Sequence, residues 1–199
     1  MSCYLSHQVL CVCDSLRAVV ISERICRGKK IKVLANGSIK GIDADSFRPL
    51  KSEEALSTRA ALGIPPQEVV LGFVGRVVRD KGLVELAQAW RRLRESFDGM
   101  HLLIVGPFEP QDPLPSPTEQ FLRTDPSIHL VGWAEDPRPL YAAMDLFVLP
   151  SYREGFGNVL LEAAAMELAV VATRIPGCLD AVQDGVTGTL VPPYDSEAL

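Results

Sequence analysis

One stretch of the sequence, residues 151–162, combines two acidic side chains with a glycine-bearing loop and the expected start of a helix. An apolar strand ends at Pro150, and helical periodicity begins near Asn158. Backbone amides at a helix start have no partner within the helix, so this point can bind an anion. Glu154 in the loop and Glu162 in the helix can accept hydrogen bonds from two hydroxyl-bearing groups of one ligand. The alternative is that Glu154 is an exposed loop acid and that Glu162 only complements the helix dipole.

Two positive charges follow an earlier apolar strand, in Gly75-Arg76 and the nearby Lys81-Gly82. A glycine allows the backbone to turn sharply beside a ligand. Arginine suits bidentate contact with a phosphate, and lysine acts as a point charge. An ordinary basic loop is the alternative interpretation. The three-glycine dinucleotide fingerprint is absent here, and Gly28-Lys29-Lys30 lacks the other residues of a P-loop.

A third loop carries Gly132 and Trp133 directly after an apolar strand. An aromatic ring or a backbone edge at this place can face a nucleobase. Packing of Trp133 in the core or at its rim is the alternative.

Alternating strands and helices position all three loops. Short apolar or β-branched runs alternate with segments of helical periodicity from about residue 68 onward. Continuous apolar strands separated by helices indicate a parallel sheet covered on both faces, which is a doubly wound, Rossmann-like α/β domain. Ligands of such sheets bind beyond the carboxyl ends of the strands, where these loops lie. The expected strands are 69–74, 102–105, 128–131, 146–149 and 170–172, and the expected helices include 83–97, 139–144 and 158–167.

The first 47 residues follow a different pattern, with two short strands around one helix. Two strands and a helix cannot bury a core of their own. We therefore expect residues 1–47 to be the end of a preceding domain. Residues 48–199 are expected to be the Rossmann-like domain, truncated at its C-terminal end. Both ends of the chain are expected to be cut from a longer protein.

The composition fits a globular protein and argues against several classes. The 199 residues are 47% hydrophobic, and the net charge of −5 is unsuited to a broad electrostatic grip on nucleic acid. The five cysteines lack the spacing of a zinc ribbon or a disulfide framework, and free thiols in a reducing cytosol are the simplest explanation. No segment has the roughly 18 apolar residues of a membrane span, and no export signal is visible. We expect a cytoplasmic protein.

Together these residues resemble glycosyltransferase family 4, whose members have the two-domain GT-B architecture and retain the anomeric configuration of the transferred sugar. The resemblance covers nearly the whole chain, and six motifs occur in the order of the family. Glu154 and Glu162 stand at the family's Glu-seven-residues-Glu spacing. The other motifs are Asn36-Gly37 with Gly41-Ile42-Asp43 and Phe47-Arg48-Pro49, Gly75-Arg76 with Lys81-Gly82, Gly132 before the run 145–151, Thr173 to Gly177, and Gly185 to Gly188.

The resemblance implies a role for each site residue. Arg76 and Lys81 would hold the donor diphosphate and stabilise the departing nucleoside diphosphate. Glu154 would contact the hydroxyls of the donor sugar, and Glu162 would bind the ribose. Arg76, Lys81 and Glu154 are thus the expected catalytic residues. The remaining donor-binding residues are Gly75, Gly132, Trp133, Gly155, Phe156, Gly157 and Asn158.

The junction sequence at residues 37–43, Gly-Ser-Ile-Lys-Gly-Ile-Asp, is most similar to bacterial enzymes that build capsular polysaccharide or exopolysaccharide on a lipid-linked carrier. This similarity implies a UDP-sugar donor and a saccharide or lipid-linked acceptor, the latter bound by an N-terminal domain that this chain lacks. The full-length enzyme would then make peripheral contact with the cytoplasmic face of the membrane. The nucleotide sugar is a co-substrate, and neither a cofactor nor a metal ion is expected.

Two features depart from the family pattern. Glu167 and Ala169 occupy a turn where the family usually has glycine and proline, and Glu167 is strained if that glycine has a positive φ. The acceptor domain is also missing, with its glycine-rich loop and the histidine that the family places near the sugar. The histidines of this chain, His7, His101 and His129, do not lie in that context.

Three other functions stay open. Asp43-Ala44-Asp45 matches the Asp-x-Asp signature of metal-dependent, single-domain glycosyltransferases, although it precedes the link between the domains. A sugar-nucleotide 2-epimerase would share the architecture, but the segment from Glu154 to Glu162 favours the transferase. The chain can also be a module that binds the donor without turnover, since we expect the fragment alone to be inactive.

Overall fold

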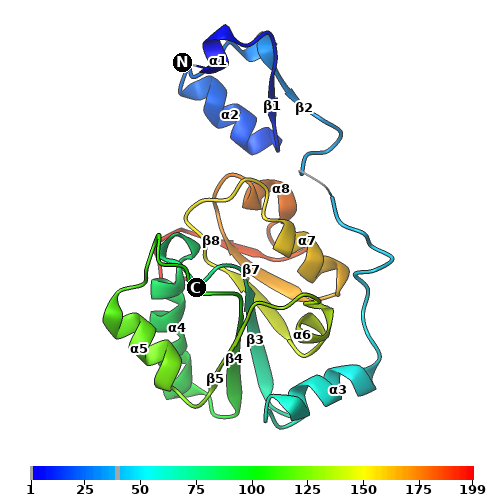
Figure 1. The fold of residues 1–199 in the computed structure, drawn as a ribbon, viewed down its shortest axis with the longest axis vertical. Helices are drawn as coiled ribbons and strands as arrows, with labels where there is room; N and C mark the ends of the chain where they lie inside the picture. Colours follow the sequence, from blue (N-terminus) through cyan, green and yellow to red (C-terminus); the bar gives the residue numbers. More distant parts are fainter. Residues whose placement is uncertain (1, 39–40) are drawn as a thin grey trace.

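The computed structural model describes residues 2–38 and 41–199, so Ile39 and Lys40 of the junction sequence lie outside the described residues. Its main feature is a six-stranded, all-parallel sheet with the strand order β5-β4-β3-β6-β7-β8 (Figure 1). The strands are β3 (Val69–Val74), β4 (Met100–Val105), β5 (Ile128–Gly132), β6 (Leu146–Leu149), β7 (Ala169–Thr173) and β8 (Thr189–Val191).

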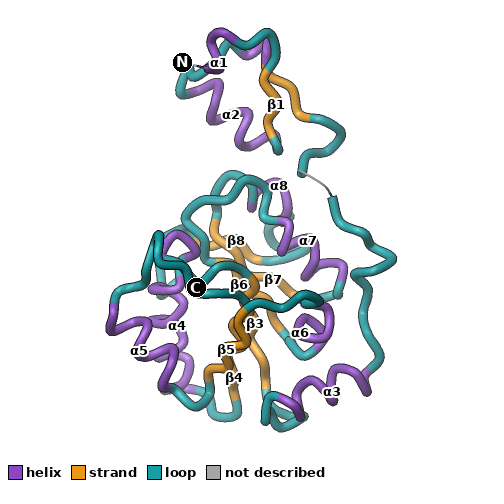
Figure 2. Tube along the Cα trace, in the orientation of Figure 1, coloured by secondary structure: helices purple, strands orange, loops and turns teal. Residues whose placement is uncertain are grey.

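The strand order is that of a Rossmann fold. Counted from β3, it reads 3-2-1-4-5-6, and the chain crosses from one half of the sheet to the other after β5. All five strands expected from the apolar runs are present and pair in parallel, which confirms the predicted doubly wound fold. The strands β3, β4 and β6 are mostly buried because helices stand on both sides of the sheet, as Figure 2 shows, whereas the edge strand β5 is mostly half-buried.

The helices divide between the two faces of the sheet. On one side lie α4 (Leu83–Ser96), which the short turn η2 (Arg79–Lys81) precedes, and α5 (Ser116–Thr124) (Figure 1). On the other side lie α3 (Ser52–Ala61), α6 (Arg138–Ala142) and α7 (Asn158–Ala165), while α8 (Cys178–Ala181) follows β7. Within the described ranges, no helix has the length and apolar character needed to cross a membrane.

Helix α4 illustrates how the apolar spacing determines packing. Leu83, Leu86 and Trp90 recur at helical spacing and are almost fully buried against the sheet. The predicted helix extended to Phe97, and this end is wrong. The helix ends at Ser96, and Phe97 has extended backbone and a side chain that is 56% exposed, because the chain turns here to enter β4.

The pairing between β3 and β6 is short, and hydrogen bonds from Arg59 stabilise it at one end. β3 pairs with β4 over six residues but with β6 over only two, Leu71 and Gly72. At the amino ends of the two strands, the buried Arg59 donates to the carbonyl of Ala143 (2.9 Å) and to the carboxylate of Asp145 (2.7 Å). Beyond Gly72 the ladder stops, so the loops that leave β3 and β6 can diverge around a ligand.

Residues 2–38 form a small unit beside the sheet domain (Figure 1). Its strands, β1 (Val9–Cys11) and β2 (Ile31–Val33), pair with each other, and its helical elements are α1 (Ser2–Leu5), α2 (Asp14–Ser22) and the turn η1 (Gly28–Lys30). The carboxylate of Asp180 in α8 accepts the backbone N–H groups of Asp14 (3.0 Å) and Ser15 (3.2 Å), which ties the start of α2 to the sheet domain. The expected domain boundary at residues 47 and 48 stays a prediction.

Helix α7 ends in a left-handed turn at Glu167, whose φ is +61°. The N–H of Glu167 bonds to the carbonyl of Ala164, and the N–H of Leu168 bonds to that of Ala163, both at 3.0 Å. This is the Schellman pattern, in which glycine is the usual residue at the left-handed position. The strain predicted at Glu167 is therefore present in the structure, and it also ends the helix earlier than expected.

Replacing Glu167 by glycine should stabilise the domain, because glycine adopts this backbone without a Cβ clash. We expect the free energy of unfolding to rise by about 1 kcal/mol and the Tm by about 2–4 °C, as measured by circular dichroism. Glu167→Ala removes the same exposed side chain but keeps Cβ, so it should bring no such gain. Equal gains in both variants would assign the effect to the glutamate side chain.

Candidate functional site

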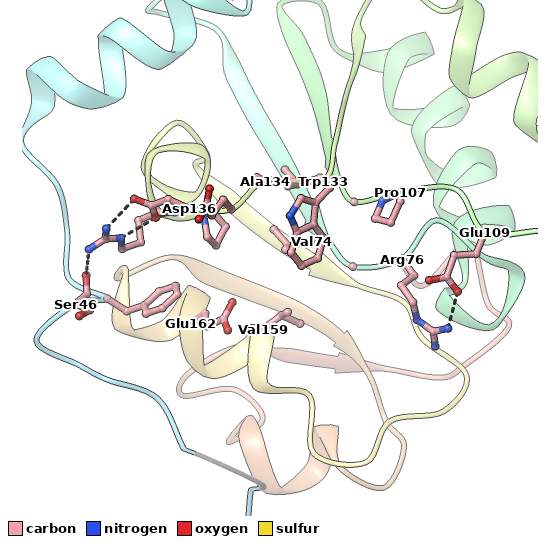
Figure 3. A pocket seen from close by; sticks show the side chains of 17 residues that line it. Ser46, Val74, Arg76, Pro107, Glu109, Trp133, Ala134, Asp136, Val159 and Glu162 are labelled. Atoms are coloured by element: carbon pink, nitrogen blue, oxygen red, sulfur yellow. Dashed lines mark hydrogen bonds and ion pairs between the residues drawn. The ribbon is translucent and has the colours of Figure 1, made fainter.

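A cavity of about 730 Å³ opens beyond the carboxyl ends of β3, β4 and β5. Its walls come from the loops that follow these strands, from α7 and from the junction segment at Ser46 and Phe47 (Figure 3). This is the edge of the sheet at which a Rossmann-like domain binds ligands. The charged and aromatic side chains on the walls include Arg76, Glu109, Trp133, Asp136, Arg138 and Glu162.

Close backbone contact brings the loops after β3 and β4 together. Gly106 has a φ of +138°, and a Cβ atom on it would lie 1.9 Å from the carbonyl oxygen of Gly75. Beside this contact, the Arg76 guanidinium pairs with the Glu109 carboxylate at 2.9 Å. The Arg76 side chain is 57% exposed, so an anion in the cavity can compete with Glu109 for it.

Lys81 belongs to a second cluster, which the structure builds from the turn before α4 and the loop after β6. Its ammonium group lies 2.5 Å from Oε1 of Glu154, and Ser151 donates its hydroxyl to the same oxygen at 2.7 Å. The Lys81 and Glu154 side chains are only 16% and 11% exposed. Gly82 makes this contact possible, because a Cβ atom on it would lie 2.0 Å from the carbonyl oxygen of Pro150.

The loop from Gly155 to Asn158 lies against residues of the N-terminal unit. Cys13 donates its thiol to the carbonyl of Gly155 at 3.2 Å, and a Cβ atom on Gly37 would lie 2.9 Å from the Phe156 ring. Ser38 bonds to the side-chain oxygen of Asn158 at 2.7 Å. The N-terminal unit therefore contacts this loop at Gly155, Phe156 and Asn158.

Helix α7 begins directly after this loop, with Gly157 at its N-cap in a left-handed conformation (φ +71°). Among the described residues, no side chain caps this helix start. Its amide groups can therefore bind an anion, as the sequence predicted for this point.

Trp133 and Glu162 stand on different walls of the cavity (Figure 3). The Trp133 side chain is 80% exposed, so the alternative of core packing for this residue is wrong. Glu162 projects from α7 toward the space that Trp133 borders, and its Oε2 accepts a hydrogen bond from the Tyr141 hydroxyl at 2.9 Å. Burial and the neighbouring Glu162 carboxylate raise the pKa of Tyr141, so its hydroxyl remains a donor.

The Asp-x-Asp sequence is engaged in a local turn. The Asp43 carboxylate accepts the hydroxyl of Ser46 at 2.7 Å and the backbone N–H of Asp45 at 3.0 Å, and the hydrogen bond from Ser46 is the main cause of a lowered Asp43 pKa. Neither aspartate lines the cavity. In the part of the chain that the structure describes, no group of three His, Cys, Asp or Glu side chains has the geometry of a metal site.

The structure divides the predicted site residues into two groups. Gly75, Arg76, Trp133 and Glu162 border the cavity. The others lie outside its lining: Lys81, Gly132, Glu154, Gly155, Phe156, Gly157 and Asn158. Lys81 and Glu154 meet each other in the second cluster.

Three partners of these residues were not found from the sequence: Glu109, Tyr141 and Ser151. Tyr141 left a weak signal, since it is a polar-tipped residue in an apolar helical segment. Glu109 follows the strand-ending Gly106-Pro107 and could have been noted for that position.

Comparison with known proteins gives the same family as the sequence motifs. The family model described as glycosyl transferases group 1 matches residues 68–199. The capsular polysaccharide biosynthesis glycosyltransferase CapM of Staphylococcus aureus is 32% identical over 196 residues, which cover 98% of this chain and 51% of that protein. A D-inositol 3-phosphate glycosyltransferase of Corynebacterium urealyticum is 36% identical over 167 residues, or 79% of this chain and 39% of that protein.

Solved structures share the fold. HepE of Anabaena in complex with UDP-glucose matches with a TM-score of 0.82 and 25% identity, over 96% of this chain and 51% of that chain. The chain thus spans about half the length of the relatives that cover nearly all of it. From the family match and the similarity to CapM, we conclude that this chain belongs to the group 1 glycosyltransferases.

Proposed function

We propose that this chain is the donor-binding part of a retaining glycosyltransferase that moves a sugar from a UDP-sugar to a saccharide or lipid-linked saccharide. The observation that carries the proposal is the cavity at the carboxyl edge of the sheet, which Arg76, Trp133 and Glu162 border together. A cation, an exposed aromatic ring and a carboxylate suit a phosphate, a base and a ribose, respectively. The solved complexes of HepE with UDP and UDP-glucose support the choice of donor.

In this proposal each part of the donor meets different residues. Trp133 faces the base, Glu162 binds the ribose, and Arg76 holds the diphosphate. Glu154 contacts the hydroxyls of the transferred sugar, while Lys81 beside it adds positive charge near the phosphates. The loop from Gly155 to Asn158 would then run along the sugar and the phosphate.

The chemistry that these residues supply is stabilisation of the leaving group. When the bond to the sugar breaks, negative charge develops on the departing nucleoside diphosphate. Arg76, Lys81 and the free amides at the start of α7 would neutralise this charge in place of a metal ion. Removal of one such donor typically slows an enzyme by roughly a hundred- to a thousandfold.

Turnover also needs an acceptor site, which we assign to the part of the relatives' length that this chain does not span. The similarity to CapM supports a role in capsular polysaccharide biosynthesis. We further propose a cytoplasmic enzyme that contacts the membrane peripherally. In this proposal the 199-residue chain binds the donor but is inactive by itself.

UDP should bind the 199-residue chain and change its tryptophan fluorescence. Trp133 is exposed in the cavity, whereas the other tryptophan, Trp90, is fully buried in α4. Arg76→Glu should weaken UDP binding at least about tenfold, because charged hydrogen bonds of roughly 1.5–3 kcal/mol are replaced by repulsion. Calorimetry gives the affinities.

Arg123→Glu is the matched control for Arg76→Glu. Arg123 also pairs with a glutamate at 2.9 Å and is 50% exposed, but it lies outside the cavity lining. It should bind UDP like the wild-type chain. If Arg76→Glu also bound UDP with the wild-type affinity, Arg76 would not be part of the binding site. A wild-type chain that bound no nucleotide would contradict the proposed function.

Replacing Glu154 or Glu162 by glutamine should change the binding of UDP and UDP-sugars in different ways. Glu162→Gln should weaken both UDP and UDP-sugars by about ten- to a hundredfold, the value of a charged hydrogen bond. Glu154→Gln should leave free UDP almost unaffected and reduce the discrimination among UDP-sugars in calorimetric titrations. Its amide keeps an acceptor for Ser151 and Lys81, so the cluster can stay closed. A similar loss of UDP affinity in both variants would refute this division of roles.

Binding of UDP should not depend on a divalent ion. We expect the affinity measured in EDTA to lie within about twofold of that in manganese, because the positive charges near the diphosphate come from the protein. Asp43→Asn should have no effect in either condition. Binding that required manganese and was lost in Asp43→Asn would instead support the metal-dependent alternative.

A further inference from the structure

The carboxylate of Glu162 is held from behind by a buried tyrosine. Tyr141, on α6, has no exposed surface, and its hydroxyl lies 2.9 Å from Oε2 of Glu162 on α7. The other carboxylate oxygen, Oε1, accepts no hydrogen bond from any residue that the structure describes. One oxygen is thus fixed from the protein side, and the other is the one offered to a ligand.

The Tyr141 ring is itself held by two aromatic neighbours. Phe47 of the junction packs edge-on against it, with ring centroids 6.2 Å apart and an interplanar angle of 73°. Phe147 of β6 lies at a centroid distance of 5.6 Å. Burial raises the pKa of the hydroxyl, so Tyr141 stays protonated, and the two rings pack against it. Its shorter hydrogen bond, at 2.9 Å, goes to Glu162, and the carbonyl of Val159 lies at 3.5 Å.

We propose that Tyr141 is the positioning residue for Glu162 and thereby determines the preference of the cavity for a ribonucleotide over a deoxyribonucleotide. This inference rests on the proposed function, in which Glu162 binds the ribose. A free glutamate on a helix has several rotamers, and the hydrogen bond from Tyr141 selects one before the ligand arrives. A carboxylate held in this rotamer can accept a hydrogen bond from a ribose hydroxyl. A deoxy analogue leaves this acceptor without a partner and therefore binds more weakly.

The junction takes part in this arrangement. Phe47 lines the cavity and packs on Tyr141, although it precedes the region of the family match, which begins at residue 68. The ribose end of the site is therefore completed by a residue that precedes the region of the family match.

The test is the ratio of the affinity for UDP to the affinities for 2′-deoxy-UDP and 3′-deoxy-UDP, measured by calorimetry on the 199-residue chain. The wild-type chain should prefer UDP over at least one analogue by about tenfold or more. Tyr141→Phe keeps the ring but removes the donor, and it should lower this ratio by about three- to tenfold. A ratio taken within one variant cancels any loss of folded protein, so a merely structural role would not change it.

Two further variants complete the experiment. In the Glu162→Gln background, Tyr141→Phe should have no additional effect on the ratio, because the two residues act as one unit. Tyr152→Phe is the matched control, since the Tyr152 hydroxyl also bonds to a glutamate, Glu85, but neither residue lines the cavity. This variant should keep the wild-type ratio.

The outcomes separate the inference from the function on which it rests. A wild-type chain that binds UDP and prefers it to the deoxy analogues, with the same ratio in Tyr141→Phe, would overturn the role of Tyr141 alone. A wild-type chain that binds UDP without this preference would also overturn it, because Glu162 would not then read the ribose. A chain that binds no nucleotide would overturn both.

Discussion

The site depends on the short seam between β3 and β6, where the two halves of the sheet meet. Only Leu71 and Gly72 of β3 pair with β6, whereas all of β3 pairs with β4. Arg59 closes the amino end of the seam with charged hydrogen bonds to Asp145 and to backbone carbonyls, which are costly to leave unmade when buried. Arg59 joins the two strands at their amino ends, and they are not paired beyond Gly72 at their carboxyl ends. The loops that follow the carboxyl ends therefore have room for a ligand.

Direct backbone contacts then set the distances between the loops around this opening. Gly106 lies against Gly75, and Gly82 lies against Pro150, at separations that no side chain would permit. These contacts carry the charged residues with them: Arg76 follows Gly75 directly, and Lys81 precedes Gly82. The backbone positions from which the positively charged side chains project are thus fixed by contacts between main-chain segments.

Much of the fold and part of the site could be predicted from the sequence alone. Continuous apolar runs separated by helical periodicity are local patterns, and they predicted the parallel strands and the carboxyl edge of the sheet, where the cavity opens. The loop after β3 and the residues Trp133 and Glu162 were found in this way, and they do border one cavity. The turn at Glu167 was predicted through the resemblance to the family, which usually has a glycine there, and the positive φ confirms it.

What the tertiary structure alone decided is which side chains share a contact. Tyr141 and Glu162 lie on different helices, and Lys81 and Glu154 are separated by 73 residues, so neither pair leaves a periodic signal. The local pattern could not show that Lys81 and Glu154 form a cluster outside the cavity lining. Nor could it show that the Arg76 guanidinium forms an ion pair with the Glu109 carboxylate. Sequence spacing determines which residues reach the same edge of a sheet, but hydrogen-bond partners depend on how close separate loops approach, and here packing across the seam sets that approach.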